Sequence, residues 1–137
     1  SWSLDSETAA FEKMESGING RAIDFARFGL LFLNNGRWNG QQVISEAWVK
    51  ESTAPDPADQ REWPYWPEYL QNGGYYKYHW WGHVRADGHY DFTAAGAYGQ
   101  YIYVCPQKNL VIARFGENDE PLDSFREVLY ALEQMVP

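Results

Sequence analysis

Positively charged residues are scarce in this sequence. The 137 residues include 11 Lys and Arg against 19 Asp and Glu, which gives a formal net charge of −8 at pH 7. A nucleic-acid backbone or an anionic membrane surface requires a basic patch, so we expect neither as a partner. Long apolar runs are lacking as well. No stretch of about 18 apolar residues is present, and we therefore expect no membrane span.

Cysteine is almost absent. The single cysteine, Cys105, excludes a disulfide within the chain and a metal site built from cysteines. Its position beside Pro106, at the end of an apolar segment, favours a buried structural thiol over a nucleophile.

The usual signatures of a serine nucleophile are also missing. In Ser-x-x-Lys, one helical turn places the lysine amine beside the hydroxyl that it deprotonates. None of the serines has a lysine three residues later, and Tyr-x-Asn, Ser-x-Asn and Gly-x-Ser-x-Gly are absent. The sequence therefore predicts no nucleophile of these types within residues 1–137.

Three histidines lie within eleven residues, at positions 79, 83 and 89. His79 and His83 have the spacing of two metal ligands on a helix. The residues around them alternate as in a strand, where positions i and i+4 share a face but lie far apart. Surface or packed histidines are favoured over a metal site, and we expect no cofactor. The carboxylates of 117–120 are interpreted as a solvated turn.

Hydrophobic periodicity predicts three helices. Apolar residues recur with i, i+3, i+4 spacing over 21–34, and Asn34-Asn35-Gly36 is typical of a helix end in the left-handed conformation. A second short helix is expected over 46–52, with Ser45 as its N-cap. A closing amphipathic helix is expected to begin at Pro121.

Between the second and third helices, the sequence predicts a long loop followed by strands. Residues 53–75 are rich in proline and aromatic residues, and proline disfavours regular structure. Alternation predicts a strand over 76–84 and further strands at about 92–104 and 109–115. Short connections make the sheet antiparallel. We therefore expect an α+β fold, a single domain over 1–137, with an antiparallel sheet flanked by helices.

Aromatic residues make up 18% of the chain, and many of them lie between Trp63 and Tyr90. Aromatic side chains in a loop-like region often line a binding cleft. The alternative is a small core filled by large side chains. Both interpretations stay open at the level of sequence.

The most informative stretch runs from Asp91 to Pro106 and contains Gly96-Ala97-Tyr98-Gly99. Glycines at the start of a strand let the backbone approach a neighbouring group closely. One hypothesis is that the stretch presents a backbone N–H to a cleft, as one donor of an oxyanion hole. The alternative is a glycine-tolerant bulge at a strand start. Together with residues 110–114, the stretch is predicted to form a β-hairpin.

Four separate segments resemble the class C β-lactamase-related family of serine hydrolases, relatives of the penicillin-binding proteins, and especially its esterase and nylon-oligomer-hydrolase-like branch. These segments are 24–40, 43–49, 78–81 and 92–114. The resemblance implies a partial β-lactamase/transpeptidase-like fold. It also implies hydrolysis of a small-molecule ester or amide through an acyl-serine.

By this resemblance, Ala97 supplies a backbone N–H to the oxyanion hole, and Gly96 and Gly99 permit the approach. The family's Lys-Thr-Gly or His-Thr-Gly triplet is not matched, although Thr93-Ala-Ala-Gly96 stands nearby. No cationic residue is then expected for a β-lactam carboxylate. Ester or amide hydrolysis is therefore implied in preference to β-lactam hydrolysis.

The resemblance also implies residues that contact substrate. Tyr98 and Gln100 are expected to flank the pocket, with the alternative that Gln100 points into the sheet. Trp81 or Trp80 is expected to form a wall of the substrate site.

Two hypotheses about function follow. In the first, the chain is the C-terminal part of such a hydrolase; the Ser-x-x-Lys segment lies N-terminal to Ser1, and the chain alone is catalytically silent. In the second, it is a stand-alone, non-catalytic domain that uses the same sheet to bind a ligand or partner, with residues 63–81 as the surface. Part of a domain exposes apolar surface, so the first hypothesis predicts self-association into a homo-oligomer.

Overall fold

The structure is a computed structural model that describes residues 1–13, 16–59, 69, 72–117 and 122–137. Its main sheet consists of β3 (Gly74–Lys77), β4 (Trp80–Val84), β5 (Tyr90–Gly96), β6 (Gln100–Cys105) and β7 (Leu110–Arg114). All neighbouring strands are antiparallel, in the order β3-β4-β5-β6-β7.

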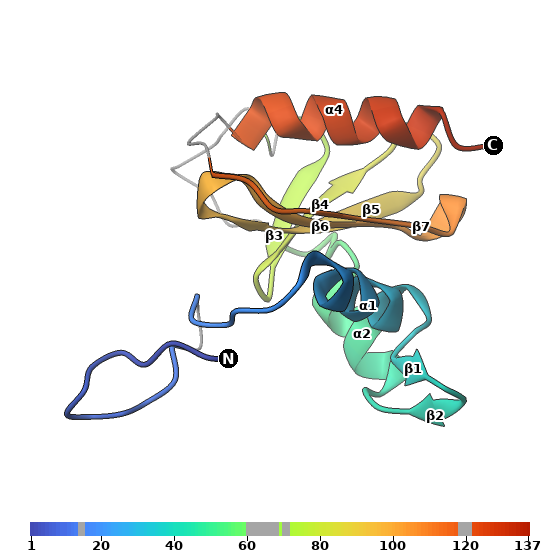
Figure 1. The fold of residues 1–137 in the computed structure, drawn as a ribbon. Coiled ribbons are helices and arrows are strands. Elements are labelled where there is room, and N and C mark those ends of the chain that lie inside the picture. Colours follow the sequence, from blue (N-terminus) through green and yellow to red (C-terminus); the bar gives the residue numbers. More distant parts are fainter. Residues whose placement is uncertain (14–15, 60–68, 70–71, 118–121) are drawn as a thin grey trace.

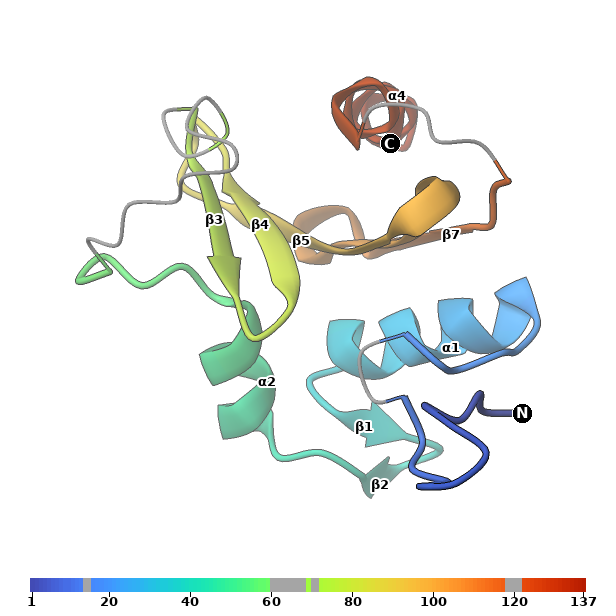
Figure 2. The same cartoon turned by 90° about the vertical axis from the view of Figure 1, so that its left-hand side faces the viewer.

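Helices cover both faces of this sheet. Helices α1 (Ala22–Leu33) and α2 (Glu46–Thr53) lie on one side, and α4 (Leu122–Gln134) lies on the other (Figure 1). Figure 2 shows the same layers from the end of the sheet. The prediction of an α+β fold with an antiparallel sheet flanked by helices is confirmed.

Local sequence signals explain where the first two helices begin and end. Helix α1 ends where Asn35 and Gly36 adopt φ values of 52° and 79°, and the N–H of Gly36 donates to the carbonyl of Leu31 at 2.8 Å. This is the left-handed C-terminal stop that the sequence predicts. Helix α2 begins after Ser45, whose side-chain oxygen accepts the N–H of Trp48 at 3.2 Å, so the predicted N-cap is confirmed.

The predicted number of strands is wrong. Residues 76–84 do not form one strand, because Tyr78 and His79 form a two-residue turn between β3 and β4. Residues 92–104 likewise contain the β5–β6 turn, a short 3₁₀ turn at Ala97–Gly99. The main sheet therefore has five strands instead of three. A two-residue turn preserves the alternation of the flanking residues, so the period-2 pattern does not reveal it.

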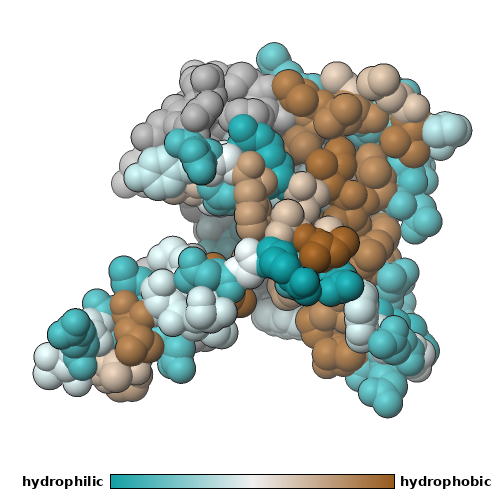
Figure 3. All heavy atoms as spheres, viewed as in Figure 1, coloured by the Kyte–Doolittle hydropathy of each residue, from teal (hydrophilic) through white to brown (hydrophobic). Residues whose placement is uncertain are grey.

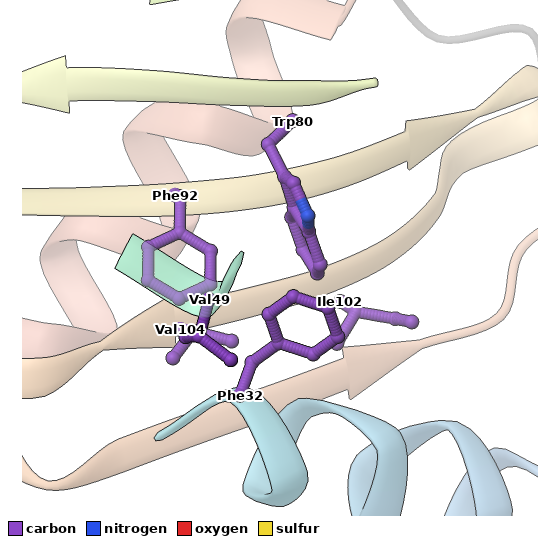
Figure 4. Packing of buried hydrophobic residues seen from close by; sticks show 6 residues of the cluster. All are labelled: Phe32, Val49, Trp80, Phe92, Ile102 and Val104. Carbon is purple, nitrogen blue, oxygen red and sulfur yellow. The ribbon is translucent and has the colours of Figure 1, made fainter. Parts of the chain in front are cut away.

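The larger core lies between α1, α2 and the sheet (Figure 4). Phe32 of α1 packs against Trp80 and Phe92, with ring centroids 4.8 and 6.5 Å away. Gly29 lets α1 approach the sheet. A Cβ at this position would lie 2.6 Å from Val111 and 2.9 Å from Ile102.

A second core lies on the opposite face, beneath α4. Leu129 of α4 is buried there with Tyr101, Tyr103 and Cys105 of β6. Alternate residues of β6 thus serve the two cores, as the pleat of a strand requires. Cys105 is buried, as the sequence predicts, and burial raises the pKa of its thiol.

A small hairpin and an N-terminal arm lie outside these layers. Strands β1 (Arg37–Trp38) and β2 (Gln41–Gln42) pair through a turn at Asn39 and Gly40. The arm is held by a bridge between Trp2 and Ile18 and extends away from the sheet (Figure 1). Much of the predicted 53–75 loop, and Pro121, lie outside the described residues.

Hydrophobic side chains are exposed on several elements. Figure 3 shows them between α4 and the elements below the sheet, and on the arm. They include Trp2 and Phe11 on the arm, Ile23 and Leu30 on α1, and Met135 after α4. Self-association, which such surface favours, stays a prediction.

Candidate functional site

The β5–β6 turn combines an aromatic side chain with an unusual backbone. Gly96 pairs with Gln100, so three residues form the turn. Tyr98 has φ 61° and ψ 22°, the left-handed conformation, and its side chain is 55% exposed. Gly99 follows with φ 76°. A non-glycine residue in this region costs about 1 kcal/mol or more, and such residues are concentrated at binding sites.

The same turn can offer backbone hydrogen-bond donors. Ala97 is the first residue of the 3₁₀ turn, and Gly96 before it is extended, with φ −121° and ψ 164°. Tyr98 interrupts this turn with left-handed φ and ψ. That the backbone N–H of Ala97 donates to an anionic oxygen stays a prediction.

Two side chains fix this turn to the end of β7. The guanidinium of Arg114 donates to the carbonyl of Gly99. Gln100 makes two bonds to Gly116: its Nε2 donates to the carbonyl at 2.5 Å, and its Oε1 accepts the N–H at 3.2 Å. Gln100 thus extends along the sheet to the segment after β7. Both contacts restrain the conformation in which Tyr98 is held.

The two predicted tryptophans lie on opposite faces of β4. Trp80 is 6% exposed and belongs to the core with Phe32 and Phe92. Trp81 is half-buried on the other face, with its ring centroid 4.5 Å from Tyr76 and 5.7 Å from Tyr69. Trp81 is the better candidate for a wall of a substrate site, and Trp80 fits the alternative of an aromatic core residue.

The β3–β4 and β5–β6 turns lie at the same end of the sheet. The pair Trp81 and Thr93 marks the end of the β4–β5 ladder from which both turns depart. Tyr78 and His79, with φ 46° and 69°, form the first of these turns. This end of the sheet therefore carries three non-glycine residues with positive φ, namely Tyr78, His79 and Tyr98.

A buried ionic cluster connects the sheet to α4. Arg85 donates from Nε to Asp91 Oδ2 at 2.7 Å and from Nη2 to Glu133 Oε2 at 2.6 Å. The hydroxyl of Tyr103 lies 3.2 Å from both carboxylate oxygens. Asp91 is 2% exposed and Glu133 is 5% exposed. Two carboxylates thus share one guanidinium inside the protein.

Burial affects proton binding at Asp91 in this cluster. It raises the pKa of Asp91 to about 6, although the Arg85 guanidinium favours the charged form. The guanidinium also lies 3.9 Å from the ring of Tyr130 on α4, a cation–π contact. These interactions hold α4 on the sheet and have a structural role.

The histidines do not form a metal site in the part of the chain that the structure describes. His79 lies in the β3–β4 turn and its Nδ1 is 3.2 Å from the Tyr76 hydroxyl, whereas His83 packs near Tyr130 of α4. Among the described residues, no group of three His, Cys, Asp or Glu side chains is placed to hold a metal ion. No described helix has the length and apolar character to cross a membrane.

Sequence reasoning identified Ala97, Gly96, Gly99, Tyr98 and Gln100, which the structure brings together in one turn and its flanks. It missed Arg114 and Gly116, which restrain that turn. A charged residue at the end of the apolar strand 110–114 was the available signal for Arg114.

Comparison with known proteins links this fold to a hydrolase. No family model matches the chain, and no curated protein matches it. Among solved structures, the chain is similar to a protein from Bacillus anthracis named "Putative 6-aminohexanoate-dimer hydrolase", with 28% sequence identity over 93% of this chain and a TM-score of 0.69. The chain spans 30% of the length of that protein. The fold of this chain thus corresponds to part of that protein.

Proposed function

We propose that this chain forms part of the active site of a β-lactamase-like serine hydrolase and supplies a backbone donor to its oxyanion hole. The observation that carries the proposal is the β5–β6 turn, in a chain whose fold is similar to part of a hydrolase. Ala97 begins this turn, and Tyr98 has a left-handed conformation within it. Gly96 and Gly99 flank these two residues.

In acyl transfer through a serine, the turn would stabilise the oxyanion that forms. When a serine hydroxyl attacks an ester or amide carbonyl, the carbonyl oxygen becomes an oxyanion. One N–H from the nucleophile's own residue and one from Ala97 would stabilise that oxygen. Tyr98 would lie beside the acyl or leaving group, with Trp81 as a wall.

The substrate class proposed is an uncharged ester or amide. Arg114 is the cation beside the turn, and its guanidinium is hydrogen-bonded to the carbonyl of Gly99. We assign it to the support of the turn and not to the recognition of a substrate carboxylate. A β-lactam carboxylate would therefore lack the cationic partner that the family's Lys-Thr-Gly provides.

Residues 1–137 contain no Ser-x-x-Lys, so the chain alone is expected to give no turnover. We would incubate it with a fluorophosphonate and measure its intact mass, and assay p-nitrophenyl acetate and nitrocefin in parallel. The expected result is an unlabelled protein and background hydrolysis. Stoichiometric labelling of one serine with ester turnover would contradict the proposal that the nucleophile comes from elsewhere.

A further inference from the structure

Glycine follows asparagine at several places in this chain. The pairs are Asn19-Gly20, Asn35-Gly36, Asn39-Gly40 and Asn72-Gly73. Asparagine is chemically labile, and a glycine after it leaves the next backbone nitrogen unshielded, because glycine has no Cβ. That nitrogen can attack the side-chain amide of the asparagine. The same dipeptide thus occurs in different surroundings, and the structure shows where the two reacting groups are unrestrained.

Hydrogen bonds restrain the first two pairs. The side-chain amide of Asn19 donates to the Ser3 hydroxyl at 3.1 Å and to the carbonyl of Gly17 at 3.0 Å. Gly36 is buried at the end of α1, and its N–H donates to the carbonyl of Leu31 at 2.8 Å. A side chain held in this way cannot reorient toward the backbone, and an N–H held in this way retains its proton.

The backbone of the last pair is packed against the sheet. Gly73 is half-buried just before β3, and its carbonyl accepts the N–H of Val84 at 2.8 Å. A Cβ on Gly73 would lie 2.7 Å from the carbonyl oxygen of Val84. The end of β4 therefore restrains the peptide unit whose nitrogen would have to move.

Asn39-Gly40 has none of these restraints. The pair forms the turn of the β1–β2 hairpin, with φ values of 47° and 80°, and both residues are exposed. A Cβ on Gly40 would meet nothing within 4 Å. Among the described residues, none forms a hydrogen bond with the Asn39 side chain or with the Gly40 N–H. Both reacting groups are accessible to water.

The hairpin that carries this turn is also small. Strands β1 and β2 have two residues each, and all of these residues are exposed. The hairpin lies outside the layers of the main sheet (Figure 2). An isolated two-stranded hairpin is marginally stable in water, and segments with few buried contacts open at the lowest cost. Opening releases Asn39 from the turn conformation, so that its side chain and the Gly40 nitrogen can meet.

We propose that Asn39 is a modification site, at which the chain deamidates spontaneously ahead of its other Asn-Gly pairs. The Gly40 nitrogen loses its proton and attacks Cγ of Asn39. The C–N bond of the side-chain amide breaks, ammonia leaves, and a cyclic succinimide forms. Water then opens the ring at either carbonyl and gives aspartate or isoaspartate. Water is consumed and ammonia is released, so the step needs no oxidant or reductant.

The products differ in their effect on the hairpin. Each adds a negative charge to a chain that already has a net charge of −8. Isoaspartate also adds a methylene group to the main chain. The two-residue turn depends on a fixed number of backbone atoms between Trp38 and Gln41, which pair across the hairpin. We therefore expect isoaspartate, but not aspartate, to disrupt this pairing.

The test measures the rate of deamidation at each pair in the full chain. The chain is incubated in ¹⁸O-labelled water at mildly alkaline pH, so that every new carboxylate carries the label, and is then digested with trypsin in ordinary water. Trypsin places the pairs on separate peptides, 14–21, 28–37, 38–50 and 62–77. We expect Asn39 to be labelled at least about tenfold faster than the others. Faster labelling at another pair, or none at Asn39, overturns the inference.

Denaturation separates the effect of the structure from that of the local sequence. In guanidinium chloride all of the pairs lose their contacts, and we expect their rates to agree within about threefold. A preference for Asn39 that persists unchanged in the denatured chain would overturn the structural basis of the inference.

Two variants test the chemistry and its consequence. Gly40→Ala places a Cβ beside the attacking nitrogen and should slow labelling at Asn39 at least about tenfold, although it also favours opening of the turn. An unchanged rate would exclude attack by this nitrogen. Asn39→Asp adds the charge without the methylene group. The amides of the hairpin should exchange hydrogen faster in the purified isoaspartyl protein than in Asn39→Asp, and equal exchange would contradict the expected loss of pairing.

Discussion

The Nη2 atom of Arg85, in the loop after β4, donates to Oε2 of Glu133 on α4 across 2.6 Å. The two residues lie 48 positions apart in the sequence. Asp91 and Tyr103 complete the cluster from β5 and β6. The last helix is therefore held by a buried ionic contact in addition to the packing of Leu129.

Removal of the shared cation should destabilise the protein strongly. Arg85→Met leaves the carboxylates of Asp91 and Glu133 buried without a counter-ion, and we expect a loss of about 3 kcal/mol in the free energy of unfolding at pH 7. Urea denaturation measures it. The control is Glu127→Gln, an exposed glutamate on the same helix, which should change stability by less than about 0.5 kcal/mol. Equal effects of the two variants would argue against the cluster.

The stability should depend on the protonation of Asp91. Its pKa is about 6 in the folded protein and near 3.8 when the chain is unfolded. Between these values the folded state binds the additional proton, so the contribution of Asp91 decreases as the pH rises from about 4 to about 6. Two pKa units correspond to about 3 kcal/mol.

The measurement compares the unchanged chain with Asp91→Asn at pH 4 and pH 7. The stability of the unchanged chain relative to the variant should fall between the two pH values. A relative stability that rises over this range would show that the sign is wrong.

Gly29 should tolerate no side chain, although it lies inside a helix. Gly→Ala normally favours an exposed helix by about 1 kcal/mol. Here the new Cβ would lie 2.6 Å from Val111 Cγ1 and 2.9 Å from Ile102 Cγ2, so overpacking should outweigh this gain. We expect Gly29→Ala to lose about 1–3 kcal/mol in chemical denaturation. Val111→Ala in the same chain should recover part of the loss, and a more stable Gly29→Ala protein would exclude the close approach.

The side chain of Gln100 should stabilise the segment after β7 through its hydrogen bonds to Gly116. Its amide bonds to both backbone groups of Gly116, and Gln100→Leu removes both bonds. We expect a loss of about 1–2 kcal/mol and at least tenfold faster hydrogen exchange at the Gly116 amide. Gln107→Leu is the control, because its side chain makes only a 3.5 Å contact with Asp87 at the surface. Unchanged exchange at Gly116 in Gln100→Leu would contradict the contact.

Local signals were sufficient for the helices and insufficient for the turns. Asn35 and Gly36 tolerate the left-handed conformation, and Ser45 can cap a helix with its own side chain. The end of α1 and the start of α2 are therefore predictable. Tyr78 and His79 carry no turn preference, and the alternation continues across them. A turn that opposes local propensity is set by the pairing of the strands around it.

The candidate site also combines features that local sequence predicts with features that it does not predict. The glycines at 96 and 99 mark the β5–β6 turn in the sequence, because they are a local signal. The contacts of Gln100 with Gly116 and of Arg85 with Glu133 depend on strand register and on the docking of α4. No pattern in a single segment contains this information.

The most direct test of the role of the β5–β6 turn measures the hydrolytic activity of a chimeric protein. Residues 1–137 would replace the structurally matched part of the Bacillus anthracis protein, and hydrolysis of p-nitrophenyl acetate, an uncharged ester, would be followed with Ala97, Ala97→Val and Ala97→Pro. Proline lacks the N–H and fits the first position of the turn, whereas valine retains the donor. We expect activity with alanine and valine, and a kcat about 10²-fold lower with proline at similar thermal stability. A proline variant as fast as the valine variant, or a folded chimera that is inert with Ala97, would contradict the assignment of this turn to the oxyanion hole.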